Sequence, residues 1–174
     1  STLFLCYAVA SVDEAVERVR RAGGTAGEPV EQPFGRVADC TDNQGVPFAL
    51  VEVAPGGQRA PANGNRHGDV AYLTMGVEDS AAARAFYQEV LGWRFRAGRV
   101  EDGWEPEDVA PMVGMHGGHD RATVVPMYRV DDIHRAVERV RGEGGRSSDP
   151  EPQGYGVTAE CTDDQGTQFY LVQF

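Results

Sequence analysis

Histidine and acidic side chains suited to chemistry gather in one stretch of the chain, between residues 101 and 119. His116 and His119 flank two glycines in HGGH, and imidazole nitrogens are ligands for Zn, Cu, Fe and Ni. Just upstream, EDGWEPED places five carboxylates within residues 101–108. The histidines fit either a metal site or exposed loop positions, and the acids fit either a contact for a cationic ligand or a solvated hairpin.

Nucleophilic catalysis has little support in the sequence. Cys6, Cys40 and Cys161 form no CxxC pair, and the last two stand at equivalent positions before turns, where a small buried thiol packs well. The chain also lacks GxSxG and the glycine spacings that bind phosphates or dinucleotides. We therefore assign no catalytic residue. Three thiols without an even framework predict a reducing, cytoplasmic location.

The stretch 72–93 has the clearest local structure of the elements that could position such side chains. Residues 72–77 alternate as a strand does, and the pair Asp79-Ser80 can cap a following helix. Apolar residues of that helix recur at three- and four-residue spacing, so one face can be buried. Gly92 then predicts the end of the helix.

An internal repeat organises the rest of the chain. Residues 4–53 align with residues 125–174 at a constant offset of 121, without a gap, and 22 of the 50 pairs are identical. Each copy reads as a strand, a helix and three further strands, with a tight turn at CTDNQG or CTDDQG before the last strand. The pattern predicts an α+β fold built of repeated βαβββ units.

The units follow one another in a simple order. Unit one covers residues 1–53, and residues 54–68 form a linker rich in Gly, Pro and Asn. Unit two, a variant of the same plan, covers residues 69–120, and unit three covers residues 121–174. Units one and three are the close copies.

Composition excludes two classes of partner. A net charge of −11 argues against a nucleic-acid surface, which needs clustered Lys and Arg. No apolar run approaches the ~20 residues of a membrane helix, and no basic-then-apolar signal segment is present. We expect a protein that binds neither nucleic acid nor membrane.

The turn VED at residues 77–79 and the run FYQEVLGW at residues 86–93 resemble the first strand and helix of the vicinal oxygen chelate superfamily, which holds glyoxalases, bleomycin-resistance proteins and extradiol dioxygenases. The resemblance implies that two units make one domain, whose curved mixed sheets enclose a cavity. Units two and three, residues 69–174, would be that domain. The whole chain resembles the last three quarters of a tandem two-domain member.

Unit one is then an orphan, because the unit that would precede it is not in the sequence. A lone curved sheet would expose an apolar face and open edges. We expect unit one to be completed by another chain, by an N-terminal segment, or by packing on the linker side. A homo-oligomer, either a homodimer or a swapped assembly, is the preferred solution.

The resemblance also implies positions for metal ligands, on the first and last strands of paired units. The first-strand positions are Phe4, Tyr72 and Val125, and the last-strand positions are Ala49 and Tyr170. The sequence does not assign the last-strand position of unit two, and His116 is the nearest residue of a type that binds metals. Since Phe4, Val125 and Ala49 have no lone pair to donate, we expect no metal and no cofactor.

What remains is a cavity that would bind a small molecule. Its expected ligand-binding residues are Tyr72, Thr74, Val125, Met127, Tyr170, Trp93 and Trp104, with Met112 and Met115 as further walls and Tyr155 at the rim. The favoured function is metal-free binding of an aromatic or natural-product ligand, for sequestration or resistance. The alternatives are a metal-dependent or tyrosine-assisted lyase, isomerase or dioxygenase of the same superfamily, and an assembly module with a filled cavity. Whether the protein is an enzyme stays open.

Overall fold

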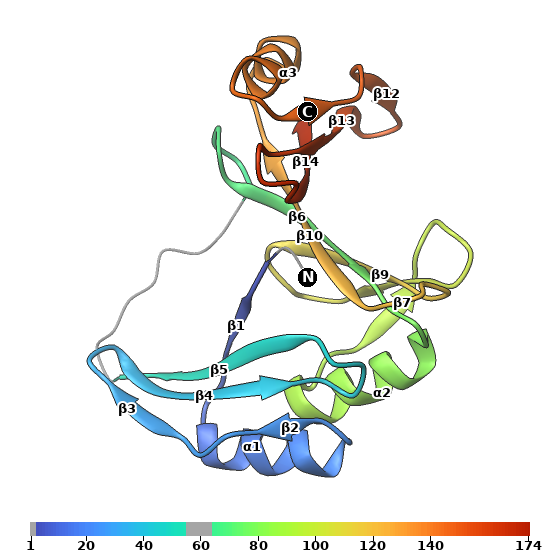
Figure 1. The fold of residues 1–174 in the computed structure, drawn as a ribbon. Coiled ribbons are helices and arrows are strands. Elements are labelled where there is room, and N and C mark those ends of the chain that lie inside the picture. The colour runs from blue at the N-terminus through green and yellow to red at the C-terminus, as the bar shows by residue number, and fades with distance from the viewer. Residues whose placement is uncertain (1–2, 55–63) are drawn as a thin grey trace.

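A computed structural model describes residues 3–54 and 64–174 of the chain. The elements follow one another in three groups, each of which begins with a strand and a helix (Figure 1). Unit one contains β1 (Leu5–Ala8), α1 (Val12–Arg21), β2 (Thr25–Ala26), β3 (Val30–Gln32), β4 (Gly35–Thr41) and β5 (Pro47–Val53). Unit two contains β6 (Val70–Gly76), α2 (Ser80–Leu91), β7 (Phe95–Ala97), β8 (Gly103–Pro106) and β9 (Met112–His116). Unit three contains β10 (Thr123–Arg129), α3 (Ile133–Gly142), β11 (Arg146–Ser147), β12 (Glu151–Gln153), β13 (Gly156–Thr162) and β14 (Gln168–Gln173).

The predicted α+β class is confirmed, and the two copies of the repeat have the same elements in the same order. Each copy also carries a two-residue strand, β2 or β11, that the sequence pattern did not separate from the helix end. Two residues are too few for alternation of side chains to be recognised in a sequence.

All three helices begin with the same kind of N-terminal cap. The side chains of Ser11, Asp79 and Asp132 cap α1, α2 and α3, and each accepts a hydrogen bond from an amide of the first turn. A cap of this kind satisfies amide protons that have no partner within the helix. Helix α2 ends at Gly92 in the left-handed conformation, which glycine adopts without steric cost.

The strands form two sheets with different extents. Sheet A belongs to unit one and runs β1-β5-β4-β2, with β3 also paired to β4. Sheet B combines units two and three in the order β11-β13-β14-β10-β6-β9-β8-β7, with β12 also paired to β13. The join is the antiparallel pair β6·β10, so units two and three share one continuous open sheet instead of presenting two separate sheets to each other.

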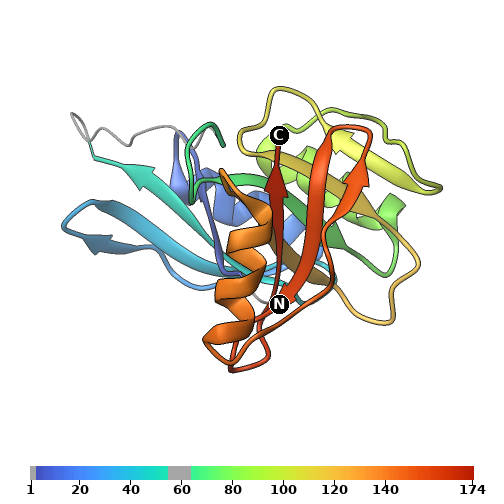
Figure 2. The ribbon, with the colours of Figure 1, turned by 90° about the horizontal axis from the view of Figure 1, so that it is seen from above.

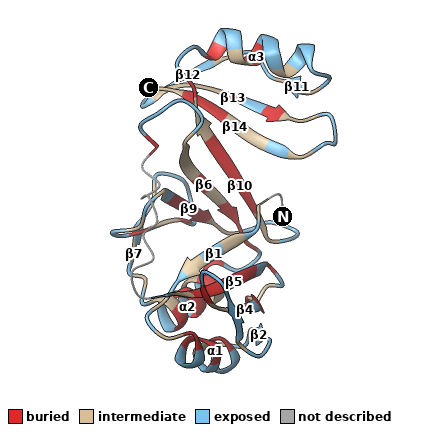
Figure 3. Ribbon diagram, turned by 90° about the vertical axis from the view of Figure 1, so that its left-hand side faces the viewer, coloured by how far each residue is buried: buried red, intermediate tan, exposed pale blue. Residues whose placement is uncertain are grey.

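The larger apolar core lies between unit one and unit two. Val16 and Val19 of α1 pack in it together with Phe86 and Val90 of α2, and all four are buried. The buried stretches of both helices are red in Figure 3. A second, smaller core lies within unit three and includes Ile133 and other residues of α3, β13 and β14. The helix side of unit one is therefore covered by unit two, so the main core crosses the boundary between residues 53 and 69.

The predicted linker at residues 54–68 lies mostly outside the described residues, which resume at Gly64. There the amide of Gly68 donates a 2.8 Å hydrogen bond to the carbonyl of Arg129, and this bond holds the start of β6 against β10. None of the described helices has the length and apolar character needed to cross a membrane.

Candidate functional site

The first and last strands of units two and three place two tyrosines side by side on sheet B. In the strand register, Met127 of β10 pairs with Tyr72 of β6 on one side and with Tyr170 of β14 on the other. Their neighbours Leu73 and Leu171 face the helices and belong to the two apolar cores. Because side chains alternate along a strand, Tyr72, Met127 and Tyr170 form one row on the face turned away from the helices.

The next row on that face contains Val125 and Thr74, which are direct partners in the same strand pair. Val125 and Met127 are buried, while Tyr72, Thr74 and Tyr170 are partly exposed. We call these five residues the tyrosine face. Five of the seven predicted ligand-binding residues are thus brought together on one surface of the sheet, and apolar side chains form its floor.

Gly114 of β9 supports the position of Tyr72. It pairs with Thr74, and a Cβ atom placed on Gly114 would lie only 1.8 Å from the hydroxyl oxygen of Tyr72. The phenol of Tyr72 therefore lies directly over the backbone of β9. Any larger residue at position 114 would push the ring away from this place.

The two ends of sheet B approach each other near the tyrosine face. The guanidinium carbon of Arg99, in the turn between β7 and β8, lies 6.0 Å from the centre of the Tyr155 ring, which follows β12. These turns belong to opposite ends of the strand order. Sheet B therefore curls around its open face, while unit one and the outer strands of unit two project to opposite sides in the view from above (Figure 2).

The tyrosines of this face are neutral phenols. Burial raises the pKa of Tyr72, and the nearby Glu105 and Tyr155 raise it further, while Arg99 opposes them. Burial is also the main cause that raises the pKa of Tyr170, followed by Glu160 and Tyr155. At neutral pH both hydroxyl groups therefore keep their protons and can donate as well as accept hydrogen bonds.

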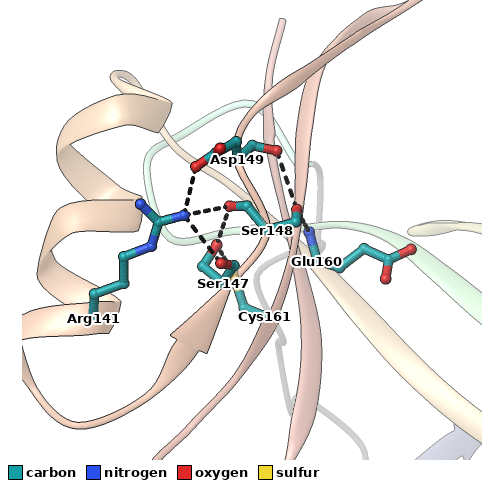
Figure 4. A network of polar contacts seen from close by, with 6 residues as sticks. All are labelled: Arg141, Ser147, Ser148, Asp149, Glu160 and Cys161. Atoms are coloured by element: carbon teal, nitrogen blue, oxygen red, sulfur yellow. Dashed lines mark hydrogen bonds and ion pairs between the residues drawn. The ribbon is translucent and has the colours of Figure 1, made fainter.

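A polar network fixes the strand that lies beside Tyr170. Arg141 of α3 donates to the carbonyls of Ser147 and Ser148 and to the carboxylate of Asp149, at 3.0, 3.1 and 2.8 Å. The hydroxyl of Ser148 in turn accepts a 3.0 Å bond from the amide of Glu160, whose carboxylate points away from the network (Figure 4). Since Glu160 pairs with Tyr170, the network ties one wall of the tyrosine face to α3.

The two predicted tryptophans lie away from the tyrosine face. Trp104 pairs with the core residue Met115, so it lies on the helix side of the sheet, where Arg84 stacks 3.6 Å from its ring centre. Trp93 stacks on Tyr87 and packs edge-on against Tyr7 of unit one. The strand register decides on which side of the sheet a side chain lies, and this register could not be known from the type of residue alone.

Trp93 instead lines a cavity of about 630 Å³ between unit one and unit two. One wall is the edge of β1, and the other walls come from the end of α2 and from Val109, Ala110, Pro111 and Val113. Its volume falls in the range of small-molecule sites, but the predicted pair of tyrosines is not part of it.

Of the two predicted methionine walls, Met112 pairs with Tyr72 and is exposed on the open face, whereas Met115 is buried in the core. Three acids of the run pair with arginines in or just before β7. Arg94 pairs with Glu107 and Asp108, and Arg96 pairs with Glu105. The acidic run thus lies in the β7·β8 hairpin.

His116 and His119 contact each other at the end of β9. The Nε2 atom of His119 lies 2.8 Å from the Nδ1 atom of His116, a hydrogen-bonding distance. Burial lowers the pKa of His116, His119 lowers it further, and Asp102 partly opposes both. Within residues 3–54 and 64–174, no group of three or more His, Cys, Asp or Glu side chains is arranged to hold a metal ion.

The positions at which the superfamily carries metal ligands do not fit a metal in this chain. The register shows that the position left open in unit two is Gly114, because it pairs with Thr74 as Tyr170 pairs with Met127. The four positions are therefore Tyr72, Gly114, Val125 and Tyr170. Glycine and valine offer no ligand atom there, which leaves only the two phenol oxygens, fewer than the three protein ligands of a usual catalytic zinc site.

Sequence reasoning missed two residues of this site, Gly114 and Arg99. Gly114 escaped because unit two is too different from units one and three for a residue-by-residue alignment. Arg99 carries no local signal, since its contact with Tyr155 depends on the curl of the whole sheet.

Comparisons with known proteins agree with this geometry. A family model described as bleomycin resistance protein-like N-terminal matches residues 72–101, which cover β6, α2 and β7. No curated protein sequence matches the chain. Among solved structures, the Mn(II)-bound glyoxalase from Novosphingobium aromaticivorans superposes with a TM-score of 0.72 at 18% identity, over 97% of this chain and 61% of the glyoxalase.

The 2,3-dioxygenase LapB from Pseudomonas sp. KL28 superposes with a TM-score of 0.68 at 13% identity, over 98% of this chain and 71% of LapB. A catechol 2,3-dioxygenase gives 0.63 at 17% identity, over 97% of this chain and 67% of that enzyme. The chain thus spans about three fifths of the glyoxalase, and at these identities the likeness concerns the fold. The chain therefore has the fold of this glyoxalase and these dioxygenases, and its segment 72–101 resembles the bleomycin resistance protein-like N-terminal family model.

Proposed function

We propose that the tyrosine face binds a small aromatic or natural-product ligand without a metal, as a sequestration or resistance protein does. The observation that carries this proposal is the row Tyr72–Met127–Tyr170, in which two half-buried phenols flank a buried methionine on an open, curled sheet. Aromatic rings and a thioether offer a large apolar contact surface, and the hydroxyl groups orient the ligand.

The protonation of the two phenols favours binding over catalysis by a tyrosine base. A general base must be deprotonated near the working pH, and burial raises the pKa of both hydroxyls instead. In their neutral form they can donate hydrogen bonds to carbonyl or phenol oxygens of a ligand. The superfamily's usual metal chemistry has no support from the side chains present at its four positions.

The match to a bleomycin-resistance-like family model makes bleomycin the first natural product to test. The net charge of −11 favours a cationic or neutral ligand over an anionic one. Glu160, beside Tyr170, adds a local negative charge to one side of the face. The unpaired thiols remain in keeping with the cytoplasmic location that we predict.

Two titrations test the proposal. Metal-free bleomycin is titrated by calorimetry, and the neutral fluorophore N-phenyl-1-naphthylamine is titrated by fluorescence. Replacing Tyr72 or Tyr170 by alanine removes ring contacts worth ~0.5–1.5 kcal/mol and a hydrogen bond of similar size, so Kd should rise roughly 5- to 150-fold. The matched control is Trp93→Ala, which alters the other cavity and should leave this affinity unchanged.

The outcomes separate the candidate functions. Equal affinity in the wild type and both tyrosine variants would place the site elsewhere. Loss of affinity in Trp93→Ala alone would assign ligand binding to the cavity beside β1. Stoichiometric binding of Mn²⁺, Fe²⁺ or Zn²⁺ that disappears in Tyr72→Phe or Tyr170→Phe would favour the metal-dependent enzyme.

A further inference from the structure

We propose that His116 and His119 together bind one divalent transition-metal ion, Cu²⁺ or Ni²⁺, with water molecules at the other positions of the ion. The two histidines enclose the glycines of the HGGH turn at the end of β9. Two protein ligands are fewer than the three of a catalytic zinc site, so we expect an ion that exchanges readily. The proposal does not depend on the ligand of the tyrosine face.

Both imidazole rings lie on the same side of sheet B as the tyrosine face. His116 pairs with Gly76 of β6 and stands two residues after Gly114, so alternation along the strand places its side chain on the open face. A Cβ atom placed on Gly76 would lie 3.1 Å from two ring atoms of His119, so this ring occupies the space above Gly76. Gly76 is ~13 Å along the strand from Tyr72 at 3.3 Å per residue, and the histidines therefore form a separate site.

The separation of the two ring nitrogens suits one ion. The Nε2 atom of His119 lies 2.8 Å from the Nδ1 atom of His116. Two imidazoles at right angles on an ion, each ~2.0 Å from it, have their nitrogens ~2.8 Å apart, whereas the tetrahedral geometry of zinc places them ~3.3 Å apart. Right angles between neighbouring ligands are typical of tetragonal Cu²⁺ and Ni²⁺. The turn thus presents two nitrogens at the spacing that these ions need.

The orientation of the rings also suits two ligands of one ion. The ring centres are 4.3 Å apart, and the ring planes make an angle of 67°. Two imidazoles joined by a straight N–H···N hydrogen bond would have their centres roughly 5 Å apart, so both rings are inclined to the line between the nitrogens. The ion would take the place of the shared proton, which can move to the other nitrogen of its own ring.

Backbone hydrogen bonds fix the turn that carries both histidines. The carbonyl of His116 accepts from the amide of Val77 at 2.9 Å, and the amide of His119 donates to the carbonyl of Val77 at 3.1 Å. Between them, the amide of Gly118 donates to the carbonyl of Glu78 at 3.2 Å, and the left-handed φ of 82° at Gly118 suits glycine. Because the ligands are held in place beforehand, little conformational freedom is lost when an ion binds.

A carboxylate lies against the same turn. Asp102 accepts a 2.6 Å hydrogen bond from the hydroxyl of Ser80, and this bond lowers the pKa of Asp102. A Cβ atom placed on Gly117 would collide with the other oxygen of this carboxylate. Burial and His119 lower the pKa of His116, while Asp102 opposes them. The ring of His116 is therefore neutral at pH 7, as a metal ligand must be, and a negative charge beside it favours a cation.

A titration with Cu²⁺ tests the site. All chains carry Cys6→Ser, because Cys6 is exposed and its thiolate would compete for copper. We expect one Cu²⁺ per chain and two bound imidazoles in pulsed electron paramagnetic resonance. His119→Ala and His116→Gln should each leave one imidazole on the ion and raise Kd at least about tenfold, since loss of a group that only orients a ligand costs 10- to 100-fold. The matched control is His134→Ala on α3, where the histidine is also exposed, and it should bind copper as the parent chain does.

Three results would overturn the proposal. The first is a single bound imidazole, or none, in the parent chain. The second is an equal Kd for Cu²⁺ in the parent chain and in the double variant His116→Gln/His119→Ala. The third is loss of copper in Tyr72→Phe or Tyr170→Phe, which would place the ion among the tyrosines. Urea unfolding shows whether each variant is folded, and His119→Ala, which alters an exposed side chain, decides the outcome if His116→Gln is not.

Discussion

Substitution of Gly114 by alanine tests the tyrosine face without altering any side chain that would touch the ligand. The added Cβ would lie 1.8 Å from the hydroxyl oxygen of Tyr72. Carbon and oxygen atoms need a separation of about 3.4 Å, so the hydroxyl has to move by roughly 1.6 Å. Gly114 has no left-handed backbone angle, and the variant therefore carries no strain of that kind.

The displacement should weaken ligand binding more than folding. The atom that must move is the tip of a side chain on a partly exposed face, so we expect the free energy of unfolding to fall by less than about 1 kcal/mol. A ring displaced from its stacking position and a misplaced hydroxyl together forfeit ~1–3 kcal/mol of binding, or roughly 5- to 150-fold in Kd. Fluorescence titration with N-phenyl-1-naphthylamine and urea unfolding measure the two quantities.

A double-mutant cycle identifies the cause of the effect. In a Tyr72→Ala background no hydroxyl remains for the new methyl group to displace, so Gly114→Ala should change Kd no further. Gly142→Ala, where an added Cβ meets nothing within 4 Å, serves as the control glycine substitution and should bind as the wild type does. Our reasoning is refuted if Gly114→Ala binds normally, or if its effect is the same with and without the Tyr72 ring.

Three further predictions concern groups that are buried or partly buried. Tyr87→Phe removes the hydroxyl that donates a 3.0 Å bond to the buried carboxylate of Asp42 and should destabilise the fold by ~1–3 kcal/mol in urea unfolding. Burial raises the pKa of Cys40 to about 11, so in a chain with no other thiol its alkylation by iodoacetamide at pH 8 should be about a hundredfold slower than that of the unfolded chain. Burial and His119 lower the pKa of His116. The unfolded chain therefore binds more protons than the folded chain as the pH falls below about 6.5, and the free energy of unfolding should decrease there. The decrease should be smaller in His116→Gln.

Each of these predictions has a result that contradicts it. A change below about 0.5 kcal/mol for Tyr87→Phe would show that Asp42 finds another donor. Equal alkylation rates in the native and unfolded chains would mean that the Cys40 thiol is not protected by burial. An NMR titration that gives His116 a pKa above the ordinary histidine range would reverse the sign of the pH effect.

The sequence alone determined the local structure and the repeated plan. The cap at Asp79 and the helix end at Gly92 are set by hydrogen bonds and steric limits within a few residues, so they could be located without a structure. The repeat then fixed the order of elements in units one and three. The family resemblance, and not the repeat, singled out Tyr72 and Tyr170 as ligand positions, and the strand register brings them to one row.

Only the tertiary structure decided which surfaces these elements share. Whether Trp104 faces the helices or the open side depends on its pairing with Met115, and a shift of one residue in register would reverse it. The contact between α1 and α2, which merges unit one with unit two in one core, and the approach of Arg99 to Tyr155 join residues far apart in the chain. Such contacts arise from the summed burial of apolar surface over the whole molecule, and no local pattern of residue types records that sum.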